Sequence, residues 1–288
     1  MKKTITVTAY NRPEYLRQAL ESLIRNSLDG WKIYFSIDPS EAREEILRVI
    51  QETLPAKVER EVITQSRRLG VSGNPFFILR KAFEEGSEMN IYLEEDIRVS
   101  PDITRLADWY SEFDLEHCLC LNLLHGNCGG DRNLSLPPKD LLIRTRNFNS
   151  LGFILTRDQW TSFFEPHWFE QSPASGKNSL IPVKEGWDWS ILRYHLKRKT
   201  RLYTLQPLCA RSNHIGRSGG TYCLPEFHDI VFSGIRLNED PGPIRYRVAS
   251  GLAASVWGVI LRVCDMYKKI RRTKHSISNA YFKSSAIS

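Results

Sequence analysis

The sequence predicts an α/β fold with a mostly parallel central sheet flanked by helices. Short apolar segments rich in β-branched residues alternate with longer segments whose apolar residues recur at helical spacing. The first such segment, residues 4–9 (TITVTA), is typical of a buried strand. Because strands that alternate with helices form parallel sheets with right-handed crossovers, the first hundred residues predict successive βα units.

The elements of the first half follow in order. Asn11 is expected to cap the first helix, with Pro13 in its first turn, and Ser40 is expected to cap the second. The apolar spacing and the turn residues predict strands at residues 4–9, 32–37 and 58–64, helices after Asn11 and at residues 40–53 and 74–85, and a fourth strand from Ile91.

The pattern after Asp102 is mixed. Two polar, turn-rich segments, residues 126–138 and 171–182, are typical of substrate-binding loops. The other segments predict helices at residues 103–113 and 158–164, short strands at 118–124, 141–144 and 152–156, and a helix at 244–269.

Composition limits the class of protein. The 288 residues are 41% hydrophobic and 25% charged, and the formal net charge is +7. This charge is compatible with an anionic ligand, an anionic membrane surface or nucleic acid. The basic residues are not interleaved with aromatic ones, so a nucleic-acid partner is not expected. The six cysteines form no CxxC pair, which predicts free thiols in a reducing compartment rather than a zinc site.

An acidic cluster follows the fourth predicted strand. Glu94, Glu95 and Asp96 come directly after the apolar run Ile91-Tyr92-Leu93. Adjacent carboxylates repel one another unless a cation binds them, and oxygen ligands at the carboxyl end of a strand suit Mg²⁺ or Mn²⁺ with phosphates. The alternative is a solvated acidic turn after an edge strand.

Two other residues follow predicted strands. Asp38 could accept a hydrogen bond from a base or ribose, or be a turn aspartate before Pro39. Arg12 could face a phosphate or base, or lie on the surface. The sequence contains neither GxGxxG nor GxxxxGK[ST], so any bound nucleotide would need a metal for its phosphates.

Two clusters in the second half could carry chemistry. Asp188 lies between Trp187 and Trp189, which could raise its pKa toward that of a general base, or it could cap a helix. Residues 211–222 (RSNHIGRSGGTY) combine a pliant glycine backbone with polar donors. His214 in this segment could be a metal ligand or a hydrogen-bonded core histidine.

The last segment, residues 241–288, predicts a basic amphipathic helical tail. Its apolar part is followed by the basic run at residues 268–274. No apolar run reaches the ~20 residues that span a bilayer. The helix could lie on an anionic membrane surface or pack on the main domain.

The order of several segments resembles the α-1,3-mannosyl-glycoprotein β-1,2-N-acetylglucosaminyltransferase family, whose members are inverting, metal-dependent GT-A glycosyltransferases. The similarity runs over residues 4–227, and its motifs are AYNRPEYLRQALESL, SIDPS, IYLEEDIRVSPD, LLIRTRNFNSLGFILTRDQW, GWDWS and HIGRSGG. It implies a GT-A catalytic domain at residues 1–240, with a nucleotide-sugar-binding half (1–102) and an acceptor-binding half (103–240).

The resemblance also implies site residues. Asp96 corresponds to the only direct protein ligand of Mn²⁺ (or Mg²⁺), and Asp188 to the catalytic base. Further residues correspond to positions that bind a UDP-sugar: Arg12 and Asp38 near the uracil, Glu94 and Glu95 near the sugar and ribose, and Gly219, Gly220 and Thr221 over the phosphates. Asn74 replaces a donor-contacting histidine of the family, which leaves the donor sugar open.

The expected reaction is transfer of a sugar, with N-acetylglucosamine as one candidate, from a UDP-sugar to a glycan or other hydroxyl acceptor. The alternatives are a sugar-nucleotide nucleotidyltransferase and a non-catalytic carbohydrate-binding relative. The sequence shows neither the membrane anchor nor the stem of the Golgi enzymes, so we expect a cytoplasmic, bacterial-type relative, peripheral on a membrane if the tail binds lipid.

Overall fold

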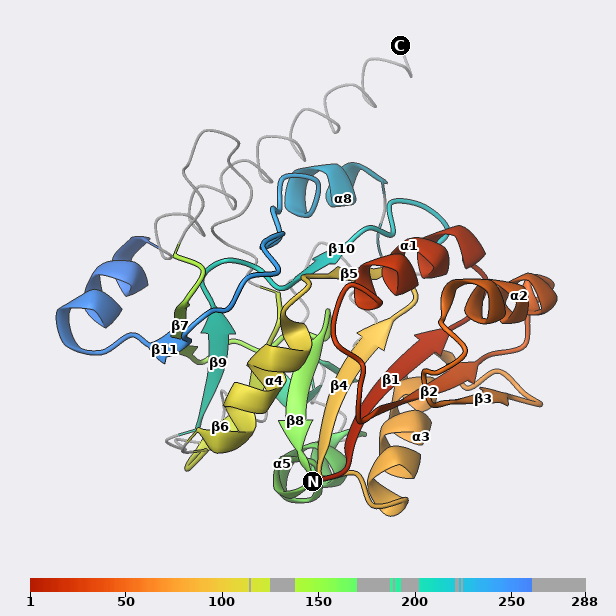
Figure 1. The fold of residues 1–288 in the computed structure, drawn as a ribbon, viewed down its shortest axis with the longest axis horizontal. Helices are drawn as coiled ribbons and strands as arrows, with labels where there is room; N and C mark the ends of the chain where they lie inside the picture. Colours follow the sequence, from red (N-terminus) through yellow and green to blue (C-terminus); the bar gives the residue numbers. More distant parts are fainter. Residues whose placement is uncertain are drawn as a thin grey trace, which may run out of the picture.

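The computed structural model places a nine-stranded sheet at the centre of the chain (Figure 1). It describes residues 1–113, 115–124, 138–169, 187–188, 190–192, 202–220, 223 and 225–260. The strand order is β11-β7-β9-β6-β8-β4-β1-β2-β3, and a separate two-stranded sheet joins β5 to β10. The strands are β1 Lys3–Ala9, β2 Trp31–Ile37, β3 Arg60–Thr64, β4 Met89–Glu94, β5 Ile97–Val99, β6 Cys118–Asn122, β7 Leu141–Thr145, β8 Phe153–Thr156, β9 Tyr203–Pro207, β10 Ser212–His214 and β11 Arg247–Val248.

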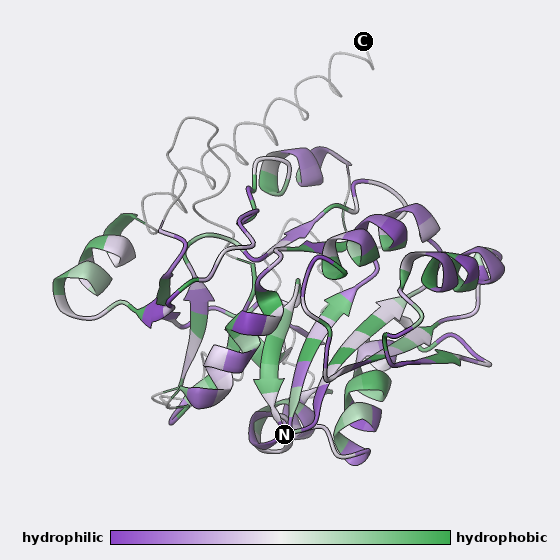
Figure 2. Cartoon of the chain, in the orientation of Figure 1, coloured by the Kyte–Doolittle hydropathy of each residue, from purple (hydrophilic) through white to green (hydrophobic). Residues whose placement is uncertain are grey.

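Helices cover both faces of the parallel half of the sheet. Side chains of α1, α2 and α4 pack with Ile5, Ile33 and Ile91 on one face, and side chains of α3 pack with Tyr34 and Tyr92 on the other. Figure 2 shows hydrophobic residues along these strands and hydrophilic residues on the outer surfaces of α1 and α2. The helices are α1 Pro13–Leu23, α2 Arg43–Thr53, α3 Gly70–Glu84, α4 Ile103–Glu112, α5 Arg157–Gln159, the π-helix η1 Trp160–Phe164, α6 Glu165–His167 and α8 Pro225–Val231.

The predicted α/β fold with a mostly parallel sheet is confirmed. Strands β3, β2, β1 and β4 are all parallel neighbours, whereas β8 runs antiparallel to both β4 and β6. The mixed pattern after Asp102 therefore corresponds to a mixed half of the same sheet. Cys118, Cys120 and Cys209 are free thiols, as predicted.

The predicted helix starts are less accurate. The first helix begins at Pro13 with Arg12 as its N-cap residue, and no side chain caps it, so the prediction for Asn11 was wrong. The second begins at Arg43, because the Ser40 hydroxyl donates to the carbonyl of Tyr10 instead of capping the helix.

Two further bounds differ from the prediction. The third helix begins at Gly70 rather than Asn74, because Asp38 accepts hydrogen bonds at its start. The segment expected to be helical from residue 244 first forms β11. There the Arg247 N–H donates to the Asp140 carbonyl and the Ala249 N–H donates to the Leu142 carbonyl of β7. Residues 251–260 are helical, and no helix in the described ranges is long and apolar enough to cross a membrane.

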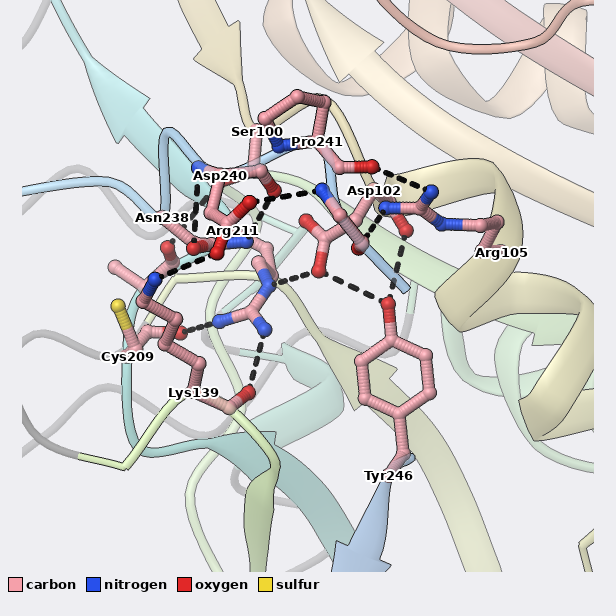
Figure 3. Close-up of polar contacts among 12 residues, drawn as sticks. Ser100, Asp102, Arg105, Lys139, Cys209, Arg211, Asn238, Asp240, Pro241 and Tyr246 are labelled. Carbon is pink, nitrogen blue, oxygen red and sulfur yellow. Dashed lines mark hydrogen bonds and ion pairs between the residues drawn. The ribbon is translucent and has the colours of Figure 1, made fainter. Parts of the chain in front are cut away.

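A buried polar network holds β10 in place (Figure 3). The Arg211 and Asp102 side chains are both 0% exposed, and the Arg211 Nε donates to Asp102 Oδ2 at 2.8 Å. The Tyr246 hydroxyl donates to the same carboxylate oxygen at 2.9 Å. The Ser100 N–H donates to the Arg211 carbonyl, so this network fixes the segment that leads into β10.

Candidate functional site

The carboxyl ends of β1, β2 and β4 lie at one edge of the sheet, because these strands are parallel neighbours. Arg12 comes after β1, Asp38 follows β2, and the acidic residues 94–96 end β4. Strand β5 starts directly after Asp96 and pairs antiparallel with β10. Strand β10 ends at His214. The topology thus collects side chains from four segments at this edge.

Arg12 and Glu95 form a nearly buried ion pair. The Arg12 Nε donates to Glu95 Oε1 at 2.7 Å, and the backbone N–H of Tyr10 donates to Glu95 Oε2 at 2.7 Å. Both oxygens of Glu95 are therefore engaged, and its side chain is only 3% exposed. This geometry makes Glu95 the residue that sets the position of the Arg12 guanidinium.

Asp96 lies at the centre of the cluster. Its Oδ2 is 2.7 Å from Arg12 Nη1 and 2.9 Å from His214 Nε2, and its Oδ1 is buried without a hydrogen-bond partner. Burial raises the pKa of Asp96, but the hydrogen bond from His214 and the charges of His214 and Arg12 outweigh burial and lower the pKa below its ordinary value. Asp96 is thus held as a carboxylate with one oxygen atom available.

Glu94 lies near Asp96, but its pKa is raised rather than lowered. Burial, followed by the negative charge of Asp96, raises the pKa of Glu94 to about 8, and the Tyr92 hydroxyl and Arg12 oppose this rise. The Tyr92 hydroxyl donates to Glu94 Oε1 at 3.1 Å. The charge of Asp188 also raises this pKa, which places Asp188 within electrostatic reach of the acidic cluster.

Gly216 makes close packing against the cluster possible. A Cβ atom at this position would lie 2.1 Å from Asp96 Oδ2 and 2.8 Å from Arg12 Nη1. The neighbouring Ile215 N–H donates to the Asp96 carbonyl at 2.9 Å. Any side chain at residue 216 would therefore displace the Asp96 carboxylate or the backbone that covers it.

The glycine-rich segment continues over Arg12. Cβ atoms at Gly219 and Gly220 would lie 3.4 Å and 3.3 Å from Arg12 side-chain atoms, and Gly219 has a φ of +74°. Arg217, which lies between Gly216 and Gly219, forms a two-fold ion pair with Asp229 of α8 at 2.9 Å and 3.0 Å. This pair ties the glycine segment to α8.

Asp38 and Asn74 lie at the start of α3. Asp38 is 3% exposed and accepts the N–H groups of Leu69 at 3.0 Å and Gly70 at 2.7 Å. The Asn74 Nδ2 donates to the Ser36 carbonyl at 3.2 Å, and its Oδ1 is buried without a partner. Asp38 thus stabilises the helix start, and the backbone occupies both of its oxygens.

Asp188 is mounted on an aromatic cluster. The adjacent Trp187 is 5% exposed, stacks on Trp168 with ring centroids 3.9 Å apart, and meets Tyr92 edge-on at 6.1 Å. The Asp188 carboxylate is partly exposed and lies 3.5 Å from the Ser150 hydroxyl. The aromatic packing fixes the backbone at residue 187 while the carboxylate remains accessible.

Some of the expected site residues fall outside the described part of the chain. These are Thr221, the Trp189 indole, the loop at 171–182 and, except for Pro138, the loop at 126–138. From the sequence, His214 could be a metal ligand or a hydrogen-bonded core histidine. In the structure it forms a direct hydrogen bond to Asp96. No local signal predicts this contact, because it depends on antiparallel pairing between β5 and β10.

The donor set of the cluster fits a divalent cation. Asp96 offers a buried oxygen without a partner, and His214 offers an imidazole nitrogen on the same carboxylate. Within the described ranges, no group of three His, Cys, Asp or Glu side chains could hold a metal ion. Mg²⁺ and Mn²⁺ sites for nucleotides use one or two protein ligands and leave the other positions to phosphates and water. A cation with Asp96 and His214 as its protein ligands would match this pattern.

Comparison with known families gives one match. The model described as "Glycosyl transferase family 2" matches residues 4–167, more than half of the chain. The matched range contains Arg12, Asp38, Asn74 and the acidic cluster, and ends before Asp188. No curated protein matches the chain.

Several solved structures are similar at low identity. S. aureus TarS 1-349 in complex with UDP has 15% identity and a TM-score of 0.49, over 74% of this chain and 60% of that one. The mannosyltransferase PcManGT from Pyrobaculum calidifontis, in complex with GDP-Man and Mn²⁺, has 13% identity and a TM-score of 0.44, over 94% of this chain and 64% of that one. The chain thus spans about three fifths of these proteins. These values support no inference about its substrate.

Proposed function

The chain belongs to glycosyl transferase family 2, and from this premise we propose that it transfers a sugar from a UDP-sugar to a hydroxyl group of a glycan acceptor with inversion at the anomeric carbon. N-acetylglucosamine is the donor sugar that we would test first. The observation that carries the proposal is the cluster of Arg12, Glu95, Asp96 and His214 at the carboxyl edge of the parallel strands.

The cluster suits a diphosphate group with its cation. Asp96 is buried and its pKa is lowered, so it remains an anion whose Oδ1 is free to ligate a metal. We assign Asp96 and His214 as the residues that hold Mn²⁺ or Mg²⁺. A cation bound there would neutralise the negative charge that develops on the departing diphosphate.

The donor-binding roles divide between direct contact and positioning. Arg12 is held by Glu95 and Asp96 beneath residues 219–220, so that a donor diphosphate or base would meet a guanidinium in a fixed position. Glu95 serves this role by fixing Arg12 rather than by contacting the donor, because both of its oxygens are engaged.

The remaining donor contacts lie around this pair. We assign Glu94 to the sugar, Asp38 and Asn74 to the base side of the pocket, and Gly219, Gly220 and Thr221 to the backbone over the phosphates. Asp38 would act largely through the start of α3, since its oxygens accept the backbone N–H groups there.

Asp188 is assigned as the general base. It removes the proton from the acceptor hydroxyl as that oxygen bonds to the anomeric carbon, while the bond between this carbon and the UDP oxygen breaks on the opposite face. A single displacement of this kind inverts the anomeric configuration. General-base assistance typically accelerates such a step by ~10²–10⁴-fold.

The product analysis tests this function directly. The protein would be incubated with UDP-N-acetylglucosamine, Mn²⁺ and a panel of mannose-containing glycans, with GDP-mannose as a control of different base and sugar. The proposal predicts equal amounts of UDP and glycosylated product, with a β-linkage from the α-linked donor by proton NMR. Pyrophosphate released in a parallel reaction with UTP and N-acetylglucosamine 1-phosphate, with no UDP formed from UDP-N-acetylglucosamine, would instead indicate a nucleotidyltransferase. Donor binding without transfer to any acceptor would indicate a non-catalytic carbohydrate-binding protein.

A further inference from the structure

The helix formed by residues 251–260 presents an apolar face to solvent. Leu252 is 81% exposed, Val256 47%, Val259 57% and Ile260 37%. Their spacing of four, three and one residues places all four side chains on one face of the helix. Most other large hydrophobic side chains of the described chain are buried, so this cluster is unusual for its surface.

A different face of the same helix attaches it to the domain. Trp257 packs against Leu141, Ile143, Leu208 and Ala249. The backbone that leads into the helix is fixed by β11 at the edge of the main sheet. The helix is therefore anchored on one side while its apolar face is directed away from the domain.

The location of the helix separates it from the candidate catalytic cluster. Strand β11 is one edge of the sheet, and the nucleotide-side strands β1, β2 and β3 lie toward the other edge. Figure 1 shows the helix projecting at the end of the molecule beyond β11, and Figure 2 shows that it lacks the strongly hydrophilic surface of α1 and α2. The helix also contains no charged residue.

The sequence that follows this helix carries most of the net charge of the protein. Residues 261–288 contain seven Lys and Arg residues and one Asp, which gives a formal charge of +6 out of +7 for the whole chain. The basic run at 268–274 lies eight residues beyond the last described position of the helix. An exposed apolar face that continues into a cationic segment complements a surface that is apolar inside and anionic outside.

We propose that residues 251–260 and the basic segment after them bind the protein to the surface of an anionic lipid membrane. The exposed side chains of Leu252, Val256, Val259 and Ile260 enter the boundary between headgroups and acyl chains, and the Lys and Arg residues pair with lipid phosphates. No apolar run in this part of the sequence reaches the ~20 residues that span a bilayer, so the segment lies along the surface rather than across it. This inference does not depend on the proposed transferase activity.

Vesicle co-sedimentation of the full chain tests the proposal. Wild type would be mixed with vesicles of equal parts phosphatidylglycerol and phosphatidylcholine, or of phosphatidylcholine alone. We expect binding to the anionic vesicles that is at least ~tenfold tighter than to the neutral ones, and that weakens as NaCl is raised. Equal binding to both vesicle types, or none to either, would overturn the proposal.

Matched variants separate the contribution of the apolar helix face to membrane binding from that of the basic residues. Leu252→Glu/Val259→Glu should weaken binding at least ~tenfold, because two of the most exposed side chains of the apolar face become charged. Val62→Glu, on β3 at the far edge of the sheet and 36% exposed, should leave it unchanged. Lys268→Gln/Lys269→Gln should weaken binding to anionic vesicles ~fivefold or more per residue, with no change for neutral ones.

Two controls complete the test. Each variant should keep the wild-type thermal midpoint, because the substituted positions in the helix are exposed. Sedimentation velocity without lipid should show the same monomer for wild type and for Leu252→Glu/Val259→Glu. A wild-type dimer that this variant dissociates would assign the apolar face to a second copy of the chain and overturn the membrane proposal.

Discussion

Replacement of Arg211 by methionine should remove a large part of the stability of this fold. The Arg211 guanidinium donates to Asp102 Oδ2 at 2.8 Å, to the Cys209 carbonyl at 2.6 Å and to the Lys139 carbonyl at 2.6 Å. Both members of the ion pair are 0% exposed. The substitution leaves a buried carboxylate whose remaining side-chain donor is the Tyr246 hydroxyl.

The expected magnitude follows from the burial of the pair. Removal of one partner from a buried ion pair typically costs ~3–5 kcal/mol, because the other charge stays in a poorly polarisable interior. Domains of this kind unfold with a free energy of about 5–15 kcal/mol, so Arg211→Met should lose roughly a fifth or more of the total. Tyr246→Phe removes one hydrogen bond to a charged acceptor and should cost only ~1.5–3 kcal/mol.

Urea denaturation monitored by tryptophan fluorescence measures these differences. Arg80→Met is the matched control: Arg80 pairs with Glu84 at 2.8 Å, but the two side chains are 53% and 62% exposed, so its loss should cost at most ~0.5 kcal/mol. The double variant Arg211→Met/Asp102→Leu should be less destabilised than the sum of its single variants, because no charge is left unpaired. A cost for Arg211→Met as small as that of Arg80→Met would mean that the buried ion pair contributes no more to stability than an exposed one.

Three further predictions concern the site and the response to pH. Asp188→Asn should lower turnover ~10²–10⁴-fold with donor affinity unchanged in calorimetry, and near-normal turnover would remove Asp188 from the base role. Gly216→Ala should weaken donor binding at least ~tenfold, because its Cβ would lie 2.1 Å from Asp96 Oδ2, whereas Gly30→Ala, with no atom within 4 Å of its Cβ, should leave donor binding intact. The hydrogen bonds from Lys81 and Tyr34 lower the pKa of Glu85 to about 2, below the ~4.3 of the unfolded chain, so its stabilising contribution is complete above the unfolded value and disappears as pH falls toward 2. Glu85→Gln should therefore cost ~1 kcal/mol at pH 7, after allowance for its partial exposure, and much less near pH 2, and an equal cost at both values would contradict this assignment.

Local sequence patterns predicted the first half of the fold because that half is built from local units. The β-branched run at residues 4–9 and the helical spacing after Pro13 each describe one element with one buried face. The structure adds that the parallel order of these units brings Arg12 and the acidic residues 94–96 to one edge of the sheet. There Arg12 contacts both Glu95 and Asp96.

The contacts that complete the site were beyond local patterns. His214 reaches Asp96 only through the pairing of β10 with β5, whose strands are more than a hundred residues apart. The helix starts at residues 13, 43 and 70 depend on where single side chains such as Ser40 and Asp38 find partners. A short strand such as β11 carries too few residues for a periodic signal, and its pairing with β7 fixed where the last described helix begins.

Asp96 is proposed to bind the donor diphosphate through a metal. Calorimetric titration of UDP-N-acetylglucosamine and other UDP-sugars into wild type and Asp96→Ala, with and without Mn²⁺, measures this binding. One UDP-sugar should bind wild type only when Mn²⁺ is present, and Asp96→Ala should lose at least ~hundredfold in affinity, because its one buried free carboxylate oxygen is removed. Donor binding that is equal with and without metal, or equal in wild type and Asp96→Ala, would contradict this proposal.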